Sequence, residues 1–418
     1  MIKSRILFLF KKFFPYLHLS FWIIYNRNKY HTLRNILVYP AFNNIKNLSD
    51  IYFRLIWALP NYLRKPLTIS IVVQKNLENI NLEELKCPYY LFNSKLNSSI
   101  KLIPETGLLN VKDYNLILLS DKSLLFKFTI KRLLKKTIVI DPEYCLTFEA
   151  TVWKNGLFYL SDQEEKKAYR QISSRNYDDF IKTHSTKDIC YCFLPGPSFD
   201  NYKNLDVLDG ALKIICNSTI INDDFLDYIK GPDLIAFADE VFHLGPSLYA
   251  ASFRERLLKV VQKYKCHVII PEEAMPLFLS YFSELRNYLI GIKTKGSINF
   301  PSPKNLKVKN TSNIFTLFML PIASYLSNKI IIIGADGRDK NDNYFWKYSK
   351  QAQFNDELMK TALIAHPSFF KDINYSFYYK RHIRYLSKLI KYGEKRGIKY
   401  YSATYSKIPC LKKRFKLI

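Results

Sequence analysis

The chain has few acidic residues and few cysteines for its length, and its apolar runs are short. Its 418 residues include 36 Asp and Glu against 63 Lys and Arg, which gives a formal net charge of +27. A surface of that sign attracts anions such as nucleotides, nucleic acid or acidic lipid headgroups. Because 48% of the residues are hydrophobic, the chain can build substantial cores, and its length suits two or three domains.

The seven cysteines are scattered and odd in number. Cys190 and Cys192 alternate along an apolar run, and no other cysteine lies close to them in sequence, so the spacing of a zinc pair is absent. Reduced thiols in a cytosolic protein are the simplest account of this usage. We therefore expect a cytoplasmic protein with no metal and no cofactor.

Residues 1–34 form a basic, aromatic-rich segment. Lys11 and Lys12 interrupt its apolar residues, well short of the roughly 18–20 apolar residues that a membrane-spanning helix needs. No small-residue cleavage site follows, which argues against a secretory signal. The mixture suits the plane of an anionic membrane surface, on the inner face of the cytoplasmic membrane. The alternative is a helix packed on the protein's own core.

Residues 35–160 alternate between strand and helix patterns, which predicts a Rossmann-like α/β domain with a parallel sheet. The strand candidates are Ile36–Tyr39, Leu67–Val73, Leu116–Leu119 and Thr137–Ile140, and the helix candidates are Leu48–Leu63 and Lys122–Lys136. No phosphate loop, catalytic triad or metal set is visible in this half. The polar residues 161–187 then predict a helix and a linker.

Residues 188–418 predict a second parallel-sheet domain whose strands end in small or polar residues. The strand candidates are Ile189–Leu194, Ala211–Cys216, Leu234–Ala238, His267–Ile270, Ile330–Ile333 and Ile398–Ser402. A late helix is expected over His382–Arg396. In parallel sheets, ligands bind at the carboxyl ends of the strands. The residues that follow these strands are therefore the candidate site of this domain.

The first of these strand ends carries Gly196, Pro197 and Ser198. Gly196 would let the backbone approach a ligand closely, and Ser198 could add a hydroxyl and a peptide N–H. The alternative is an ordinary strand-to-loop turn, because short glycine motifs are weak. Further along, Thr311 or Ser312 is expected to cap an apolar helix, whose N-terminus at the open edge of the sheet would attract an anion.

The order of these features resembles bacterial sialyltransferases of glycosyltransferase family 42. In that family a first strand ends in Gly-Asn-Gly-Pro-Ser-Leu, the second ends in Cys-Asn, a Thr-Ser-Gly opens a helix, and the next strand ends in Gly-Ile-Asp-Phe-Tyr. The counterparts here are Leu194–Phe199, Cys216-Asn217, Thr311-Ser312-Asn313 and Gly334–Gly337. The resemblance covers roughly Asp188–Ser406, about half of the chain. It also extends to the more distant motility-accessory and pterin-diphosphokinase-like proteins.

The resemblance implies a GT-A-like, sialyltransferase-type fold and a metal-independent transfer from a nucleotide sugar. The donor would be a CMP-activated sugar acid or another nucleotide sugar. The nucleotide-binding candidates, from the resemblance and from the other strand ends together, are Gly196, Pro197, Ser198, Asn217, Asp239, Thr311, Ser312, Asn313, Gly334, Asp336 and Arg338. This chain differs from the family pattern at Pro195, where the family has Asn, and at Asn313, where it has Gly. Asp336 and Asp339 could form a metal pair or serve a structural role.

The chemistry of such a site requires a base, because the acceptor hydroxyl loses its proton as it attacks the anomeric carbon. The candidates are His366, in a loop-like segment, and His382, near the start of the late helix. By position, His366 is the first choice. A hydrogen-bonded structural role is the alternative for each. Tyr344 and Tyr348, with Arg338, could stabilise the leaving phosphate, or could belong to a solvated loop.

The sequence thus predicts a glycosyltransferase that modifies a surface glycan or a lipid-linked acceptor at an anionic membrane surface. A nucleic-acid-binding protein is the main alternative, suggested by the net charge and by 31 Tyr. The basic residues are spread along the chain and no known nucleic-acid module is visible, so we expect no nucleic-acid partner. An inactive scaffold with a transferase-like fold is a third possibility.

Overall fold

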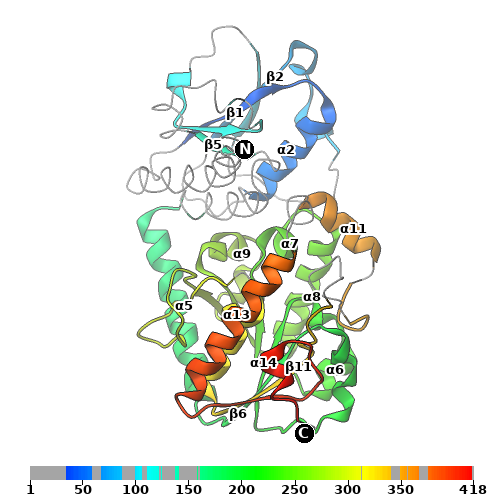
Figure 1. Ribbon diagram of the computed structural model, residues 1–418. Helices are drawn as coiled ribbons and strands as arrows, with labels where there is room; N and C mark the ends of the chain where they lie inside the picture. Colours follow the sequence, from blue (N-terminus) through cyan, green and yellow to red (C-terminus); the bar gives the residue numbers. More distant parts are fainter. Residues whose placement is uncertain are drawn as a thin grey trace, which may run out of the picture. The chain divides into compact units, whose positions relative to one another are not determined.

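The computed structural model describes residues 34–58, 67–86, 99–105, 111–121, 124, 137–140, 158, 161–311, 313–339, 349–354, 356–366 and 375–416. These residues are α/β (Figure 1) and belong to two compact units. The first unit comprises Met1–Lys166, Glu240–Leu248 and Lys360–Ile373; the second comprises Lys167–Asp239, Tyr249–Met359 and Asn374–Ile418. Residues 1–33 of the predicted membrane segment, and most of the helix expected over 122–136, lie outside the described residues.

The described part of the first unit contains a five-stranded, all-parallel sheet in the order β3-β2-β1-β4-β5. Its strands are β1 (Asn35–Phe42), β2 (Thr68–Val73), β3 (Ser99–Pro104), β4 (Leu116–Leu119) and β5 (Thr137–Val139), and helix α2 (Ile45–Ala58) follows β1. The predicted Rossmann-like strand pattern is confirmed for four strands. The edge strand β3 was not predicted, because its apolar residues are only half-buried between exposed polar ones.

The described part of the second unit contains a seven-stranded parallel sheet in the order β10-β9-β8-β7-β6-β11-β12. Its strands are β6 (Ile189–Phe193), β7 (Leu212–Cys216), β8 (Leu234–Ala236), β9 (His267–Pro271), β10 (Leu289–Ile292), β11 (Lys329–Ile333) and β12 (Lys399–Ser402). The chain builds outward from β6 to β10, then returns so that β11 pairs with the other side of β6. The order therefore reverses between β6 and β11, where a doubly wound sheet leaves a crevice at its carboxyl edge.

The strands of this sheet are apolar because both of their faces are covered. Every residue of Ile330–Ile333 is at most 1% exposed, and Cys190, Cys192 and Cys216 are equally buried as small apolar side chains. Burial raises the pKa of the Cys216 thiol well above its ordinary value, so this group is not a reactive thiolate. The three cysteines of β6 and β7 thus belong to the core.

Helices cover the sheet of the second unit, and α13 lies in front of it in Figure 1. The helices of the described residues from α5 onward are α5 (Gln163–His184), α6 (Asp223–Tyr228), α7 (Glu240–Leu244), α8 (Leu248–Tyr264), α9 (Met275–Tyr281), α10 (Leu320–Leu326), α11 (Asp356–Ala365), α13 (Tyr375–Glu394) and α14 (Pro409–Lys412). A 3-10 helical segment of eight residues, η6 (Pro197–Asn204), follows β6. None of the described helices has the length and hydropathy needed to cross a bilayer.

A π-helical turn, η10 (Phe315–Met319), leads directly into α10. Pro321 explains the wider turn: it lacks an N–H, and its ring would collide with the carbonyl four residues earlier in a regular α-helix. That carbonyl belongs to Leu317, inside the π-helical turn. The helix predicted to begin after Thr311 is thus present, with an irregular first turn.

The amino edge of the same sheet is held by one carboxylate, Asp233. It lies 3.0 Å from His184 Nε2 and 2.9 Å from Lys187 Nζ, and its other oxygen accepts the backbone N–H of Lys213 at 2.7 Å. Burial raises the pKa of Asp233, but the hydrogen bonds from His184 and Lys187 outweigh burial and leave it below its usual value. The cluster therefore joins the end of α5 to the starts of β7 and β8.

We predict that Asp233→Asn lowers the free energy of unfolding by about 1–3 kcal/mol at pH 7, because it removes charge-assisted hydrogen bonds from a mostly buried site. Urea unfolding followed by circular dichroism measures the change. The control is Asp209→Asn, whose partner Lys230 is 67% exposed, and which should leave the unfolding midpoint unchanged. Equal midpoints for Asp233→Asn and the native chain would contradict the prediction.

Candidate functional site

A cleft lies at the carboxyl ends of β6 and β11, in the second unit. Its lining residues come from the ends of three strands, the start of η10, α13 and the segment after β12: Leu194, Pro195, Gly196, Asn217, Asn313, Ile314, Phe315, Gly334, Ala335, Asp336, Gly337, His382 and Ile408. Its volume is about 60 Å³, which suits a phosphate-sized group. Several residues expected from sequence to share a site are therefore brought together here.

The cleft floor depends on two glycines that allow two backbones to touch. The Gly196 N–H donates to the Gly334 carbonyl at 3.0 Å, which extends the β6–β11 ladder into the loops. A Cβ at Gly196 would lie 2.3 Å from the Gly334 carbonyl oxygen, and a Cβ at Gly334 would lie 1.9 Å from the Leu194 oxygen. Gly334 also has a φ of +73°, which strongly favours glycine.

Asp336 joins the two loops through its side chain. Ser198 donates its N–H to both carboxylate oxygens at 3.2 Å and its hydroxyl to Oδ2 at 2.9 Å. The carboxylate thus caps η6 from a different strand. Burial raises the pKa of Asp336 above its usual value, although the bonds from Ser198 act in the opposite direction. Ser198 therefore meets the cleft indirectly, through Asp336.

Asn217 ends β7 in a left-handed backbone conformation, with a φ of 49°. Asparagine tolerates this conformation better than most residues do. Its side chain lines the cleft and makes no hydrogen bond to any other described residue. It therefore presents an amide donor and an amide acceptor that a ligand could use.

The start of η10 forms another wall of the cleft. The Asn313 side chain accepts the Phe315 N–H at 3.1 Å, so Asn313 satisfies one of the unpaired donors at the helix start. Of the two predicted caps, Thr311 or Ser312, Thr311 does not cap this helix, because its hydroxyl accepts a hydrogen bond from the Thr316 hydroxyl at 2.9 Å. The other predicted cap, Ser312, lies outside the described residues.

The helix α13 contributes His382 to the cleft and is fixed there by Tyr379. The Tyr379 hydroxyl accepts the Arg338 N–H at 3.3 Å, and a Cβ at Gly337 would lie 2.7 Å from that hydroxyl. His382 is 4% exposed, and burial lowers the pKa of its imidazole to about 3. The ring is therefore neutral at pH 7 in the absence of a ligand.

Other predicted site residues lie elsewhere or outside the described residues. His366 follows α11 in the first unit and is buried, whereas the cleft lies wholly in the second. Pro197 is exposed at the start of η6, and Asp239, which follows β8, is absent from the lining residues. Tyr344 and Tyr348 lie outside the described residues.

The acidic pair after β11 is divided between two roles. Asp336 binds Ser198, whereas Asp339 pairs with Lys407. Arg338 is buried, with its guanidinium 5.8 Å from the centre of the Tyr379 ring. Within the part of the chain that the structure describes, no group of three His, Cys, Asp or Glu side chains is placed to hold a metal ion.

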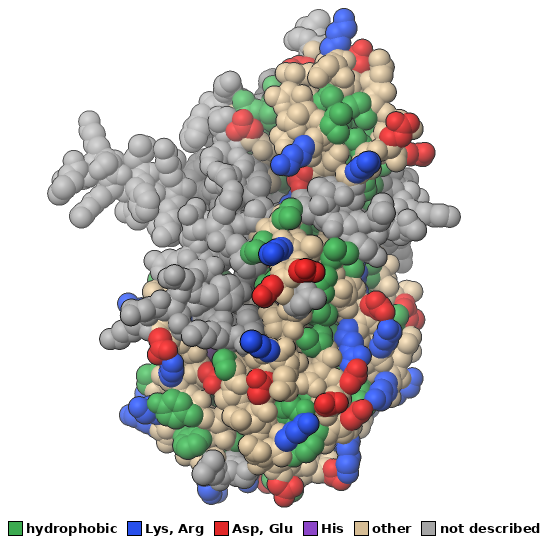
Figure 2. Space-filling view, turned by 90° about the vertical axis from the view of Figure 1, so that its right-hand side faces the viewer, with side chains coloured by type: hydrophobic (Ala, Val, Ile, Leu, Met, Phe, Trp, Pro, Cys, Tyr) green, Lys and Arg blue, Asp and Glu red, His purple; other side chains and the backbone are tan. Residues whose placement is uncertain are grey.

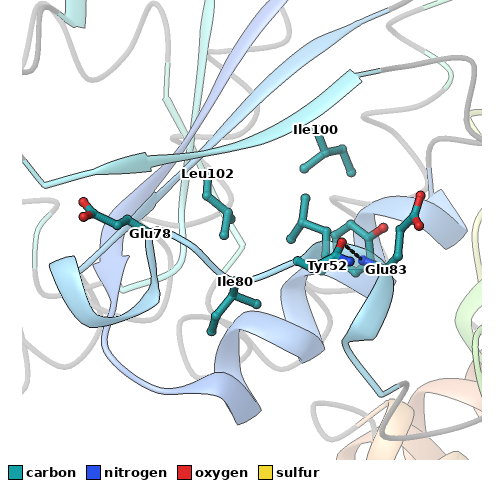
Figure 3. Close-up of a pocket in the computed structure, with 8 residues that line it drawn as sticks. Tyr52, Glu78, Ile80, Glu83, Ile100 and Leu102 are labelled. Atoms are coloured by element: carbon teal, nitrogen blue, oxygen red, sulfur yellow. Dashed lines mark hydrogen bonds between the residues drawn. The ribbon is translucent and has the colours of Figure 1, made fainter.

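The first unit contains a second, larger hollow of about 460 Å³ (Figure 3). Tyr52 of α2 lies on one side of it, Ile100 and Leu102 of β3 on another, and the segment 78–83 completes the wall. The charged side chains that line this hollow are carboxylates, which repel anions. Asn81 is engaged already, because its side chain accepts the Glu83 N–H at 3.1 Å and donates to Glu84 at 3.1 Å.

We predict that His382 makes the fold acid-sensitive. The unfolded chain binds its proton below pH 6.5 and the folded chain only below about 3. The stability from burying the neutral ring is thus complete above pH 6.5, and falls by about 1.4 kcal/mol per pH unit as the pH drops toward 3.

The variant His382→Gln should therefore lose stability less steeply between pH 6.5 and 4 than the native chain does, in urea unfolding at each pH. All other titrating groups are common to the two proteins, so the difference in slope isolates His382. Identical slopes would show that this ring does not titrate on unfolding.

Comparison with known proteins identifies no relative. No protein-family model matches the chain, and no curated protein or solved structure matches it either. The functional argument therefore depends on the residues of the cleft and their geometry.

Proposed function

We propose that the second unit is a nucleotide-sugar-dependent glycosyltransferase, similar to the sialyltransferases of glycosyltransferase family 42, that acts on a surface glycan or a lipid-linked acceptor. The observation that carries the proposal is the cleft at the reversal of strand order between β6 and β11. Doubly wound sheets bind nucleotides at such a reversal, outside the carboxyl ends of the strands. The donor would be a CMP-activated sugar acid or another nucleotide sugar.

The cleft walls suit the two halves of a nucleotide. The start of η10 and α10 presents backbone N–H groups, and the positive end of the helix dipole, to a phosphate. The Asn217 amide can donate to and accept from a sugar or a base at once. The present volume of about 60 Å³ is well below the roughly 300–1,000 Å³ of ligand pockets, so the proposal requires the cleft to widen when a nucleotide binds.

His382 is the histidine that the geometry favours as the base, because it lines the cleft and His366 belongs to the other unit. A pKa of about 3 makes a weak base, since the most effective bases have pKa values near the working pH. A phosphate in the cleft would raise the pKa of the ring by stabilising the imidazolium. Donor binding would thus prepare His382 to accept the proton of the acceptor hydroxyl.

We predict that one of CMP, UDP or GDP raises the melting temperature of the full chain, because a ligand of the folded state stabilises it by mass action. The variant Asn217→Gly should bind that nucleotide about 3–10-fold more weakly, because it loses a side-chain hydrogen bond while glycine keeps the positive φ without strain.

The matched control is Lys265→Gly, which replaces another residue of positive φ (54°) on the exposed end of α8. It should bind with native affinity. Absence of stabilisation by any of the three nucleotides, or by their sugars, would reject the transferase and favour an inactive scaffold.

We further predict that His382→Ala slows release of the nucleotide from its sugar by about a hundredfold to ten-thousandfold, the typical cost of losing a general base. Release to water can be measured before the acceptor is known. The variant should still bind the nucleotide, which shows that it folds. His366→Ala should release it at a near-native rate. The reverse pattern would make His366 the base, as its position in the sequence suggests.

A further inference from the structure

One face of α13 carries a continuous stripe of basic side chains. Its members on the helix are Lys380, Arg381, Arg384, Lys388 and Lys391, with Phe377 at the start, and Lys395 follows directly after the last residue of the helix. The steps of three and four residues keep all of them within about 100° of the helix circumference. The opposite face is buried and includes His382, Leu386 and Ile390. We refer to the basic set as the basic stripe; Arg381 is half-buried and the other five basic side chains are exposed.

The basic side chains of the stripe are not neutralised by ion pairs with other described residues. None of its six basic side chains forms an ion pair there. The single acidic residue of α13, Glu394, lies off the stripe and pairs with Arg414 at 2.5 Å. By contrast, basic and acidic side chains lie interspersed over the surface shown in Figure 2.

The segment 293–309 extends this positive surface. It contains five lysines and no acidic residue, and Lys295, Lys304 and Lys307 are exposed. The segment is fastened to α13, because the Phe300 ring lies 5.0 Å from that of Tyr392 and the Lys309 ammonium lies 5.7 Å from the Tyr385 ring. Backbone hydrogen bonds from Gly296 to Val308 and from Val308 to Lys293, both 2.8 Å, hold it together.

We propose that the basic stripe of α13, with the segment 293–309, docks the second unit on a bilayer surface rich in anionic lipid. This surface is made of residues other than 1–34, and the proposal does not depend on the activity of the cleft. A lysine or arginine near an anionic bilayer contributes roughly a fivefold gain in affinity. Several such residues on one rigid face therefore form a strong peripheral binding surface.

The shape of the stripe favours a bilayer over a nucleic acid. From Phe377 to Lys391 it runs straight for about 21 Å, which matches a flat plane of headgroups. Phe377 is 63% exposed at the start of the stripe, and an aromatic ring there suits the interface between headgroup and acyl chain. An exposed aromatic ring on a charged helix face gains little from the phosphates of a duplex.

Docking through the stripe would also set the position of the cleft. His382 lies on the opposite face of the same helix, one helix diameter, or about 10–12 Å, from the bilayer plane. If the second unit transfers sugars, an acceptor anchored in the membrane then needs to extend only a short distance. The binding surface itself can be tested without any acceptor.

The test uses the full chain and sedimentation with vesicles of phosphatidylcholine, with and without 30 mol% phosphatidylglycerol. The variant Lys388→Gln/Lys391→Gln/Lys395→Gln removes three charges of the stripe. The matched control Lys167→Gln/Lys182→Gln/Lys203→Gln removes three exposed lysines of the same unit that lie on α5 and η6. Both variants keep residues 1–34, so that segment contributes equally.

The stripe variant should bind the anionic vesicles on the order of 100-fold more weakly than the native chain, from three factors of roughly five. The control variant should bind almost as the native chain does, and no protein should bind phosphatidylcholine alone with comparable affinity. Equal binding of the two variants would overturn the proposal. So would a loss of binding to single-stranded RNA in the stripe variant with vesicle binding unchanged, because the surface would then serve nucleic acid.

Discussion

The second unit depends on one close approach, between the backbones that leave β6 and β11. Leu194, Gly196 and Gly334 meet there with no room for an added Cβ. The contact extends the hydrogen-bonded ladder beyond the sheet, so the two loops are parts of one rigid floor rather than independent segments. The hydrogen bond from the Ser198 hydroxyl to the Asp336 carboxylate also joins the two loops, independently of packing in the hydrophobic core.

The helix α13 connects this floor to the rest of the unit. Its buried face packs on the core, His382 lines the cleft, Tyr379 accepts the Arg338 N–H, and its outer face carries concentrated charge. An amphipathic helix ordinarily has two environments, apolar and aqueous. In the N-terminal half of α13 the cleft is a third environment, between the apolar face and the aqueous face. The cleft and the charged surface therefore have a fixed geometry relative to each other. A change in the angle of α13 would alter both.

The sequence predicted the sheets well and the cleft only in part. Buried strands such as β4 and β11 are continuous apolar runs, so pattern and structure coincide. The strand β10 was missed, because its four residues include Gly291, which is present where Met275 and Ser173 leave no space for a side chain. The helix α13 begins at Tyr375, ahead of the start expected at His382, so its aromatic first two turns were not predicted.

For the cleft, strand ends could be read from turn residues, which is why Gly196, Asn217 and Gly334 were found. The bond between Ser198 and Asp336 could not, because it joins residues 138 positions apart. The choice between His366 and His382 as the base also depends on where the tertiary structure places them, which no local sequence pattern encodes. The role of Asn313 as a helix cap was not predicted. Asn313 was compared with the glycine found at that position in glycosyltransferase family 42, and the capping ability of its own side chain was not considered.

The strand order has a consequence for the newborn chain. β6 is made long before β11, and the strands that follow it, β7 to β10, all build on one of its sides. Until β11 emerges, the other side of β6 is a bare edge of backbone donors and acceptors, flanked by apolar side chains that have no cover. Translation proceeds at only about 5–20 residues per second, so this edge remains open for several seconds. We expect the half-made protein to need a chaperone during that interval, more than the finished one ever does.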